Sequence, residues 1–438
     1  MAIFYVRAVL AVLLVALQPA ALASSKCKNG HWVDIWGTMP QLVEPANLPN
    51  PPYNGSNVVF ENATIRQTIF VTQDASTVRL RVSNAFGGSD LPITAITLAL
   101  PANATAGAGT SDIAPKTLRN LTFSGHPDFI VPNGALVVSD PVDFPVRAQG
   151  VLTVSIYLAT GQTTNSITGH PGSRTTSYYA PGNVVAAADL TSPAVQQSEH
   201  WYFISALEGW LPRSSGALVI VGDSITDGRG STTNGNDRWP DQLLARMRGS
   251  PGAEGAARSV AVVNQAAGGN RVLADGLGPN ALGRVDRDVL AQPGLRYAMV
   301  FEGVNDIGTA AADAASQEAV GARLVAALDQ VAARVHAAGW AAFGCTITPF
   351  SGPGQAYSDP AREATRQRVN AWIRGSGRFD AVVDFDAAAR DPANETEVNP
   401  LYNSGDYLHL NPAGYKALAE AVDLSLFERF KDGVSRMT

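Results

Sequence analysis

The chain has 438 residues, of which 45% are hydrophobic and 16% charged, and its formal net charge is −6. This length predicts two or three domains with sizeable cores, and the composition excludes a disordered chain. The negative charge and the lack of any Lys/Arg cluster disfavour nucleic acid as a partner.

The N-terminus has the pattern of a secretory signal peptide. Arg7 precedes a ten-residue apolar segment at 8–17, and Ala21-Leu22-Ala23 has the small-x-small form of a cleavage site. A membrane anchor is the alternative, but a span needs about 20 apolar residues. We therefore expect residues 1–23 to be a signal peptide, the protein to be secreted and extracellular, and no stable membrane insertion.

The glycosylation sequons of the chain agree with secretion, and its cysteines leave a disulfide open. Two cysteines are present, and Cys345 lies in the apolar run 341–347. The sequence leaves open whether Cys27 and Cys345 form a disulfide or whether Cys345 is a buried free thiol. Five Asn-x-Ser/Thr sequons are candidate glycosylation sites in exposed loops: Asn54, Asn62, Asn103, Asn120 and Asn394.

Residues 24–210 are expected to form a β-rich accessory domain. Val78, Leu80 and Val82 alternate with arginines, and 65–71 and 152–158 show a similar period of two, which predicts half-buried strands. Pro and Gly interrupt these runs at short intervals, and no helical period of useful length occurs. An all-β sandwich or jelly-roll-like domain follows from this pattern.

After a linker at 211–216, the pattern changes to alternating strands and helices. Helical patterns lie around 320–335, at 359–374 and from Pro412 to about Phe430, where Asn411-Pro412 is a good helix start. Such alternation predicts a parallel, doubly wound, three-layer α/β domain over 217–438. Apolar runs mark its strands at 217–221, 259–263, 296–301, 341–347 and 380–384.

The strand at 217–221 ends in Gly222-Asp223-Ser224, a small polar turn. Ligand crevices in open α/β sheets lie at the carboxyl ends of the strands, so Ser224 is a candidate nucleophile. A solvated turn is the simpler interpretation of the same residues. Asn264 to Asn270, Gly303 to Asp306 and Asp406 to His409 are polar segments that support the functional interpretation.

These segments contain the groups that acyl transfer needs. His409 can take the proton of Ser224, and Asp406 can fix the tautomer of His409 and stabilise its cation. The backbone N–H groups of Ser224 and Gly269 and the side-chain amide of Asn305 can form an oxyanion hole. Asn305 could instead cap its helix, and we expect Asp306 to be the capping residue of the pair.

The segments that contain Ser224, Gly269, Asn305 and His409 resemble the SGNH (GDSL-type) hydrolase superfamily. These four residues stand in the four positions that give the superfamily its name. The spacing of NQAAGGNR favours Gly269 over Gly268. The flanking segments are similar to secreted fungal and bacterial esterases with an N-terminal β-rich domain. The resemblance implies hydrolysis of carboxylic esters through an acyl-enzyme on a Ser-Asp-His triad, with no metal and no cofactor.

The sequence leaves alternatives open for two acids and for the substrate. Asp223 and Asp227 could be metal ligands, but no third ligand lies nearby, so we expect Asp227 to shape the turn. The substrate is expected to be a small-molecule or carbohydrate ester with a short acyl group, acetyl for example. A lipase or phospholipase-type acylhydrolase is one alternative, and a non-catalytic glycan-binding protein is another.

The β-rich domain is expected to pack on the catalytic domain, because the linker is too short to let the two separate. Its loops are then candidates for one wall of the pocket, with Trp32, Trp36 and 170–177 as the first candidates. His170 on its own is expected to be an ordinary loop residue.

Overall fold

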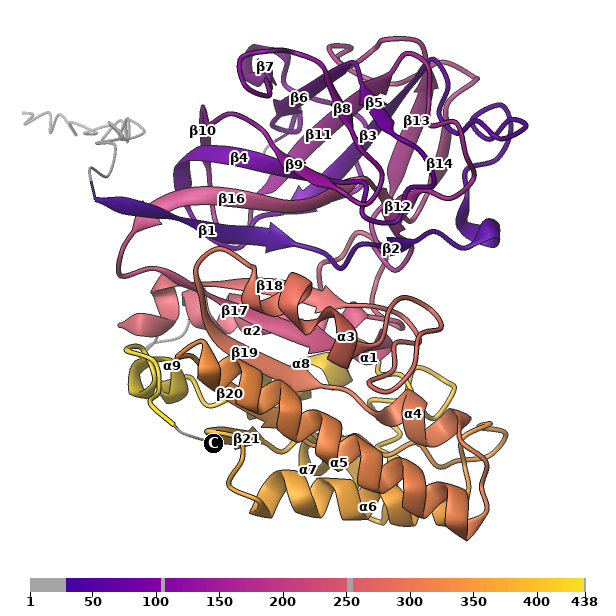
Figure 1. The fold of residues 1–438 in the computed structure, drawn as a ribbon, viewed down its shortest axis with the longest axis vertical. Helices are drawn as coiled ribbons and strands as arrows, with labels where there is room; N and C mark the ends of the chain where they lie inside the picture. Colours follow the sequence, from indigo (N-terminus) through magenta and orange to yellow (C-terminus); the bar gives the residue numbers. More distant parts are fainter. Residues whose placement is uncertain (1–28, 104–106, 250–254, 437–438) are drawn as a thin grey trace, which may run out of the picture.

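A computed structural model describes residues 29–103, 107–249 and 255–436. An N-terminal β-rich region lies above a C-terminal α/β region in Figure 1. The predicted signal peptide, residues 1–23, and Cys27 lie outside the described residues.

The β-rich region consists of antiparallel sheets, as predicted. One sheet has the order β1 (Gly30–Gly37), β16 (Ile204–Pro212), β4 (Ala75–Ser83) and β10 (Val142–Val146), with β9 (Leu136–Val138) also on β4. A second has the order β14 (Gln196–Ser198), β13 (Ser177–Pro181), β3 (Ala63–Phe70), β11 (Val151–Leu158), β6 (Ala95–Ala99) and β7 (Arg119–Asn120). The smaller sheets pair β15 (Trp201–Tyr202), β12 (Thr168–His170) and β2 (Gln41–Leu42), and β5 (Leu91–Ile93) with β8 (Phe129–Val131).

The prediction of half-buried strands was wrong for the centre of the second sheet. Seven of the eight residues of β3 are buried, polar ones included. The Arg66 guanidinium donates to the carbonyls of Ser111 and Ala187, at 2.6 and 2.9 Å. Loops therefore cover the face that the alternation pattern assigned to solvent, and their carbonyl groups satisfy the buried guanidinium.

The C-terminal region is a parallel five-stranded sheet with helices, which confirms the predicted fold class. Its order is β18 (Val260–Ala266), β17 (Gly216–Gly222), β19 (Leu295–Phe301), β20 (Ala341–Cys345) and β21 (Ala381–Val383). The helices are α1 (Ser224–Asp227), α2 (Trp239–Gly249), α3 (Ala281–Val285), α4 (Val304–Thr309), α5 (Ala314–Ala337), α6 (Pro360–Gly375), α7 (Phe385–Ala389), α8 (Pro412–Ala421) and α9 (Ser425–Arg429). A hairpin of β22 (Arg390–Asp391) and β23 (Asn394–Val398) precedes α8.

The helix predicted from Pro412 to about Phe430 is two helices. It begins as predicted, because Asn411 accepts hydrogen bonds from the N–H groups of Ala413 and Gly414. α8 ends at Ala421, since Val422 is extended and Asp423 accepts from the Ser425 N–H, which starts a new turn.

The two regions pack directly on each other, as predicted. β1 lies against β18, and a Cβ on Gly37 would come within 2.7 Å of Val263 Cγ1. The Val262 N–H donates to Thr72 Oγ1 at 3.2 Å. Residues 211–216 contain the end of β16, a three-residue turn and the first residue of β17, so little chain separates the regions.

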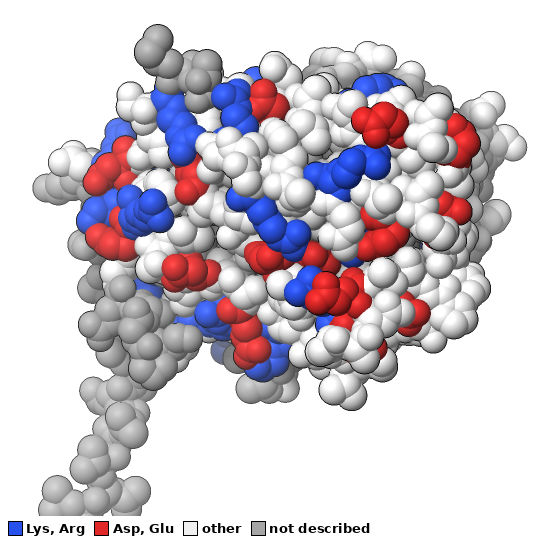
Figure 2. Space-filling view, turned by 90° about the horizontal axis from the view of Figure 1, so that it is seen from below, with Lys and Arg blue, Asp and Glu red and all other residues white. Residues whose placement is uncertain are grey.

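The structure also shows the environment of Cys345, of the sequon asparagines and of the surface charges. Cys345 is a buried free thiol, and four of the sequon asparagines are exposed while Asn54 is partly buried. Within the described ranges no helix has the length and apolar character of a membrane span. Figure 2 shows acidic and basic side chains interspersed over the face below α5 and α6.

Candidate active site

The candidate nucleophile lies at the carboxyl end of the central strand. All of β17 is buried, and α1 begins at Ser224 directly after it. Asp223 caps this helix by accepting from the Ile225 N–H at 2.9 Å, and Gly228 ends it in a left-handed conformation. This short helix holds Ser224 at the edge of the sheet, where it is 6% exposed.

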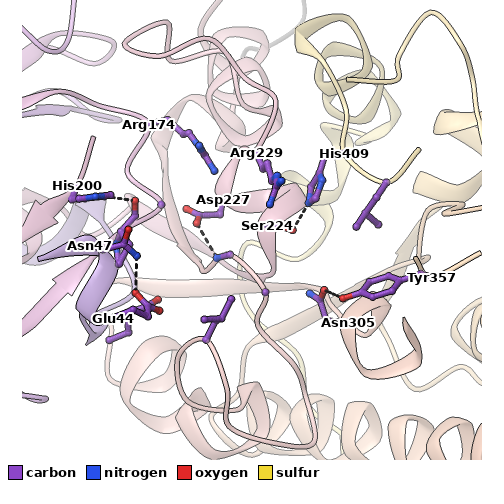
Figure 3. A pocket seen from close by; sticks show the side chains of 17 residues that line it. Glu44, Asn47, Arg174, His200, Ser224, Asp227, Arg229, Asn305, Tyr357 and His409 are labelled. Carbon is purple, nitrogen blue, oxygen red and sulfur yellow. Dashed lines mark hydrogen bonds between the residues drawn. The ribbon is translucent and has the colours of Figure 1, made fainter. Parts of the chain in front are cut away.

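Ser224, His409 and Asp406 form one chain of hydrogen bonds. Ser224 Oγ lies 2.7 Å from His409 Nε2, and His409 Nδ1 lies 2.6 Å from Asp406 Oδ2 (Figure 3 shows the first of these bonds). Because the carboxylate accepts the proton on Nδ1, Nε2 of a neutral ring is free to accept the Ser224 proton. The structure thus brings the three predicted residues together in the predicted order.

A tight turn accounts for the contact between Asp406 and His409. Tyr407 has a φ of 58°, and this left-handed residue turns the chain back on itself. Asp406 Oδ1 then accepts from the N–H groups of Leu408 and His409, at 3.1 and 2.8 Å. Partial burial raises the pKa of Asp406, but the hydrogen bonds from His409 outweigh it and bring the pKa well below its usual value.

The predicted oxyanion donors Gly269 and Asn305 line the same pocket as Ser224. Gly269 has a φ of 70°, and a Cβ there would meet Leu277 Cδ1 at 2.6 Å. The Gly268 N–H donates to Asp227 Oδ2 at 2.9 Å, whereas within the described residues the N–H groups of Ser224 and Gly269 donate to no protein acceptor. Gly269 is therefore the glycine whose N–H is available.

Asn305 is fixed by its neighbours and does not cap its helix. Its Oδ1 accepts from the Tyr357 hydroxyl at 3.1 Å, and its Nδ2 donates to the Asn270 carbonyl at 2.9 Å. One N–H of this amide remains for a ligand. The prediction that Asp306 caps α4 was wrong, because its carboxylate accepts from the N–H groups of Val272 and Leu273 in the neighbouring loop.

Comparison with known proteins identifies the domain around this site. Residues 220–417 match the family model of the GDSL-like Lipase/Acylhydrolase family. This part of the chain is a GDSL-like acylhydrolase domain. No curated protein matches the chain.

Solved structures are similar to about half of the chain. An acetyl xylan esterase variant from Geobacillus stearothermophilus is 20% identical, with a TM-score of 0.35, covering 51% of this chain and 99% of its own. A GDSL-like lipase from Bacteroides thetaiotaomicron is 15% identical, with a TM-score of 0.35, covering 49% and 88% respectively.

The pocket of the GDSL-like domain also has a wall from the β-rich region. The pocket is about 680 Å³ in volume and contains Ser224, Asn305 and His409. The β-rich wall includes the predicted segment 170–177, but Trp32 and Trp36 were wrong as candidates, because they pack on Trp210 and Trp201 instead. The residues of this wall include Gln41, Glu44, Asn47, Gly172, Arg174 and His200 (Figure 3).

His170 joins the β-rich region to the oxyanion loop and is not the ordinary loop residue we predicted. It is buried at the end of β12, with Nδ1 3.0 Å from the Met39 carbonyl and Nε2 2.9 Å from Asp227 Oδ1. His170 therefore connects the Met39 carbonyl of the β-rich region to a carboxylate of the GDSL-like domain. A Cβ on Gly172 would lie 1.8 Å from Asp227 Oδ2, so only glycine permits this close approach.

Arg284 joins the strand ends beneath the site. Its guanidinium donates to the Gln265 carbonyl at 2.6 Å and to Asn270 Oδ1 at 2.8 Å, and it lies 3.4 Å from Glu302 Oε1. Arg284 and Asn270 are both buried, so the guanidinium fixes the loop that contains Gly269.

Buried acids surround this arginine. Burial raises the pKa of Asp223 and of Glu302, and neighbouring carboxylates raise both further. No group of three or more His, Cys, Asp or Glu side chains among the described residues could hold a metal ion.

Sequence reasoning missed Tyr357, Arg284 and the role of His170. Each acts on a residue far from it in sequence: Tyr357 on Asn305, Arg284 on Gln265 and Gly222, and His170 on Asp227. None lies in a short motif, so only the spatial arrangement could identify them.

Proposed function

We propose that the protein is a secreted serine esterase that hydrolyses carboxylic esters with short acyl groups through an acyl-enzyme. The observation that carries this proposal is the hydrogen-bond chain from Ser224 through His409 to Asp406, together with the N–H groups of Ser224 and Gly269, which donate to no acceptor among the described residues. This is the set of groups that acyl transfer requires: a nucleophile, its base, an orienting acid and oxyanion donors.

In the first half of the reaction, Ser224 Oγ attacks the ester carbonyl while His409 Nε2 takes its proton. The Ser224 and Gly269 N–H groups and the Asn305 amide stabilise the oxyanion. His409 then gives its proton to the leaving alcohol as the C–O bond breaks. In the second half, water attacks the acyl-enzyme by the same route and releases the acid.

The lining of the pocket supports a short acyl group. Leu277, Tyr357 and Leu408 are the large apolar side chains among its lining residues on the GDSL-like side. A long acyl chain needs a largely apolar site, since each buried methylene gains about 0.8 kcal/mol. The polar wall from the β-rich region instead suits a hydroxyl-bearing alcohol such as a sugar.

The test is a substrate panel with wild type and Ser224→Ala. The panel contains aryl esters of increasing acyl length and acetylated sugars, and the wild-type enzyme should have its highest kcat/KM on the acetates. Ser224→Ala should lower kcat at least about 10⁴-fold. Highest activity on long-chain esters would instead identify a lipase. Glycan binding without any Ser224-dependent hydrolysis would identify a binding protein.

A further inference from the structure

Two arginines that line the pocket have no protein partner among the described residues. Arg174 lies just after β12 in the β-rich region, and Arg229 lies just after α1 in the GDSL-like domain. Within the part of the chain that the structure describes, neither guanidinium makes a hydrogen bond or ion pair to protein, and Arg174 Nε is buried. Other buried arginines of this protein, such as Arg66 and Arg284, have several partners each.

The backbone of Arg174 has an unfavourable conformation that hydrogen bonds from its neighbours stabilise. Its φ is 51°, in the left-handed region that side-chain-bearing residues seldom adopt. The Asn234 N–H donates to the Arg174 carbonyl at 2.9 Å, and Asn234 Oδ1 accepts from the Thr176 N–H at 2.8 Å. Contacts across the two regions therefore fix an arginine whose side chain finds no acceptor within 29–103, 107–249 or 255–436, as expected where the acceptor belongs to a ligand.

The carboxylates of the pocket do not neutralise these arginines. Asp227 accepts from His170 and from the Gly268 N–H. Glu44 accepts from the side-chain amides of Gln41 and Asn47, at 2.7 and 3.0 Å. Each acid is held by other hydrogen bonds, and among the described residues neither guanidinium is paired with a carboxylate, so both can bind an anion of the substrate.

We propose that Arg174 and Arg229 bind an anionic group, a carboxylate or a sulfate, on the alcohol part of the ester. This inference rests on the proposed esterase function. His409 must protonate the leaving oxygen, so the alcohol lies beside His409, and Figure 3 shows Arg229, Arg174 and His409 extending into the pocket from the same side. Guanidinium groups match the geometry of such anions, and the amides of Gln41 and Asn47 suit sugar hydroxyls. The substrate class is therefore an acetylated acidic sugar.

The experiment compares three acetylated methyl glycosides that differ only at C6: a glucuronate, a glucose and a glucose 6-sulfate. We expect wild type to have a kcat/KM at least about tenfold higher on one of the charged substrates than on the glucose, since a hydrogen bond to a charged group contributes about 1.5–3 kcal/mol and 1.4 kcal/mol is tenfold. Preference for either charged substrate supports the proposal and identifies the anion.

Arg174→Gln and Arg229→Gln should each lower the charged-to-neutral ratio of kcat/KM about tenfold, mainly through KM. The ratio comes from a single enzyme preparation, so a folding defect cancels. Arg323→Gln removes the same charge from an exposed position on α5 and should leave the ratio unchanged. A wild-type ratio near one, or a ratio that neither pocket variant lowers, would overturn the proposal. Ser224-dependent hydrolysis of the neutral acetate would show in either case that the esterase function itself stands.

Discussion

The two walls of the pocket differ in how their polar groups are satisfied. On the GDSL-like side, Ser224, His409, Asp406 and Asn305 are held by hydrogen bonds within the domain. On the β-rich side, Arg174 has a fixed backbone, and its side chain has no hydrogen-bond partner in the described ranges. Arg229 is the exception on the GDSL-like side: with Arg174 it forms the proposed substrate-selecting pair, whereas the hydrogen-bonded groups of that side form the proposed reacting set.

The largest effect on the reacting wall is expected from Asp406→Asn. The amide cannot hold the Nδ1–H tautomer of His409 or stabilise its cation, so kcat should fall about 10⁴-fold. Because His409 holds the pKa of Asp406 well below its usual value, loss of activity through protonation of Asp406 should not occur between pH 5 and 9. Asp128→Asn, at an exposed position of the β-rich region, is the matched control and should retain wild-type kcat.

Removal of an oxyanion donor should have the next largest effect. Asn305→Ala should lower kcat about 10²–10³-fold with little change in KM, because the donor acts on charge that develops in the transition state. Tyr357→Phe removes only the group that orients the amide and should cost less, about tenfold or below. An equal loss in both variants, or a loss confined to KM, would argue against an oxyanion role.

His170→Gln tests the connection between the two walls. It leaves Asp227 buried with a weaker partner, and loss of a hydrogen bond to a buried polar group costs about 1–3 kcal/mol of unfolding free energy. We expect a lower Tm and a kcat reduced about tenfold, because Asp227 also holds the Gly268 N–H. The double variant His170→Gln/Asp227→Asn should regain part of the stability; simple additivity of the two losses would show that the pair does not interact.

The smallest effect concerns the acids beneath the site. Burial raises the folded-state pKa of Glu302, so the folded protein binds more protons than the unfolded chain above about pH 4, and stability falls as pH rises. Glu302→Gln cannot ionise, so its Tm relative to wild type should increase from pH 5 to pH 8. Each unit of raised pKa corresponds to about 1.4 kcal/mol. A Tm difference that is constant with pH would contradict this.

The sequence predicted the GDSL-like wall better than the β-rich wall for a physical reason. The strand positions and the placement of Ser224, Gly269, Asn305 and His409 follow from apolar runs and from short polar turns at strand ends, which are local signals. His170, Gly172 and Arg174 meet Asp227 and Asn234 through the packing of two regions, and no local pattern encodes that contact. The same reason explains why β3 was predicted half-buried, since distant loops cover its outer face.

The central claim is that Ser224 is the nucleophile, and covalent labelling tests it most directly. A fluorophosphonate probe should form one adduct that peptide mass spectrometry places on Ser224, with loss of activity in proportion to labelling, because an activated serine attacks phosphorus as it attacks an acyl carbon. The Ser224→Ala variant should take up no probe. Hydrolysis that continues in the labelled enzyme, or labelling that Ser224→Ala does not abolish, would contradict the account.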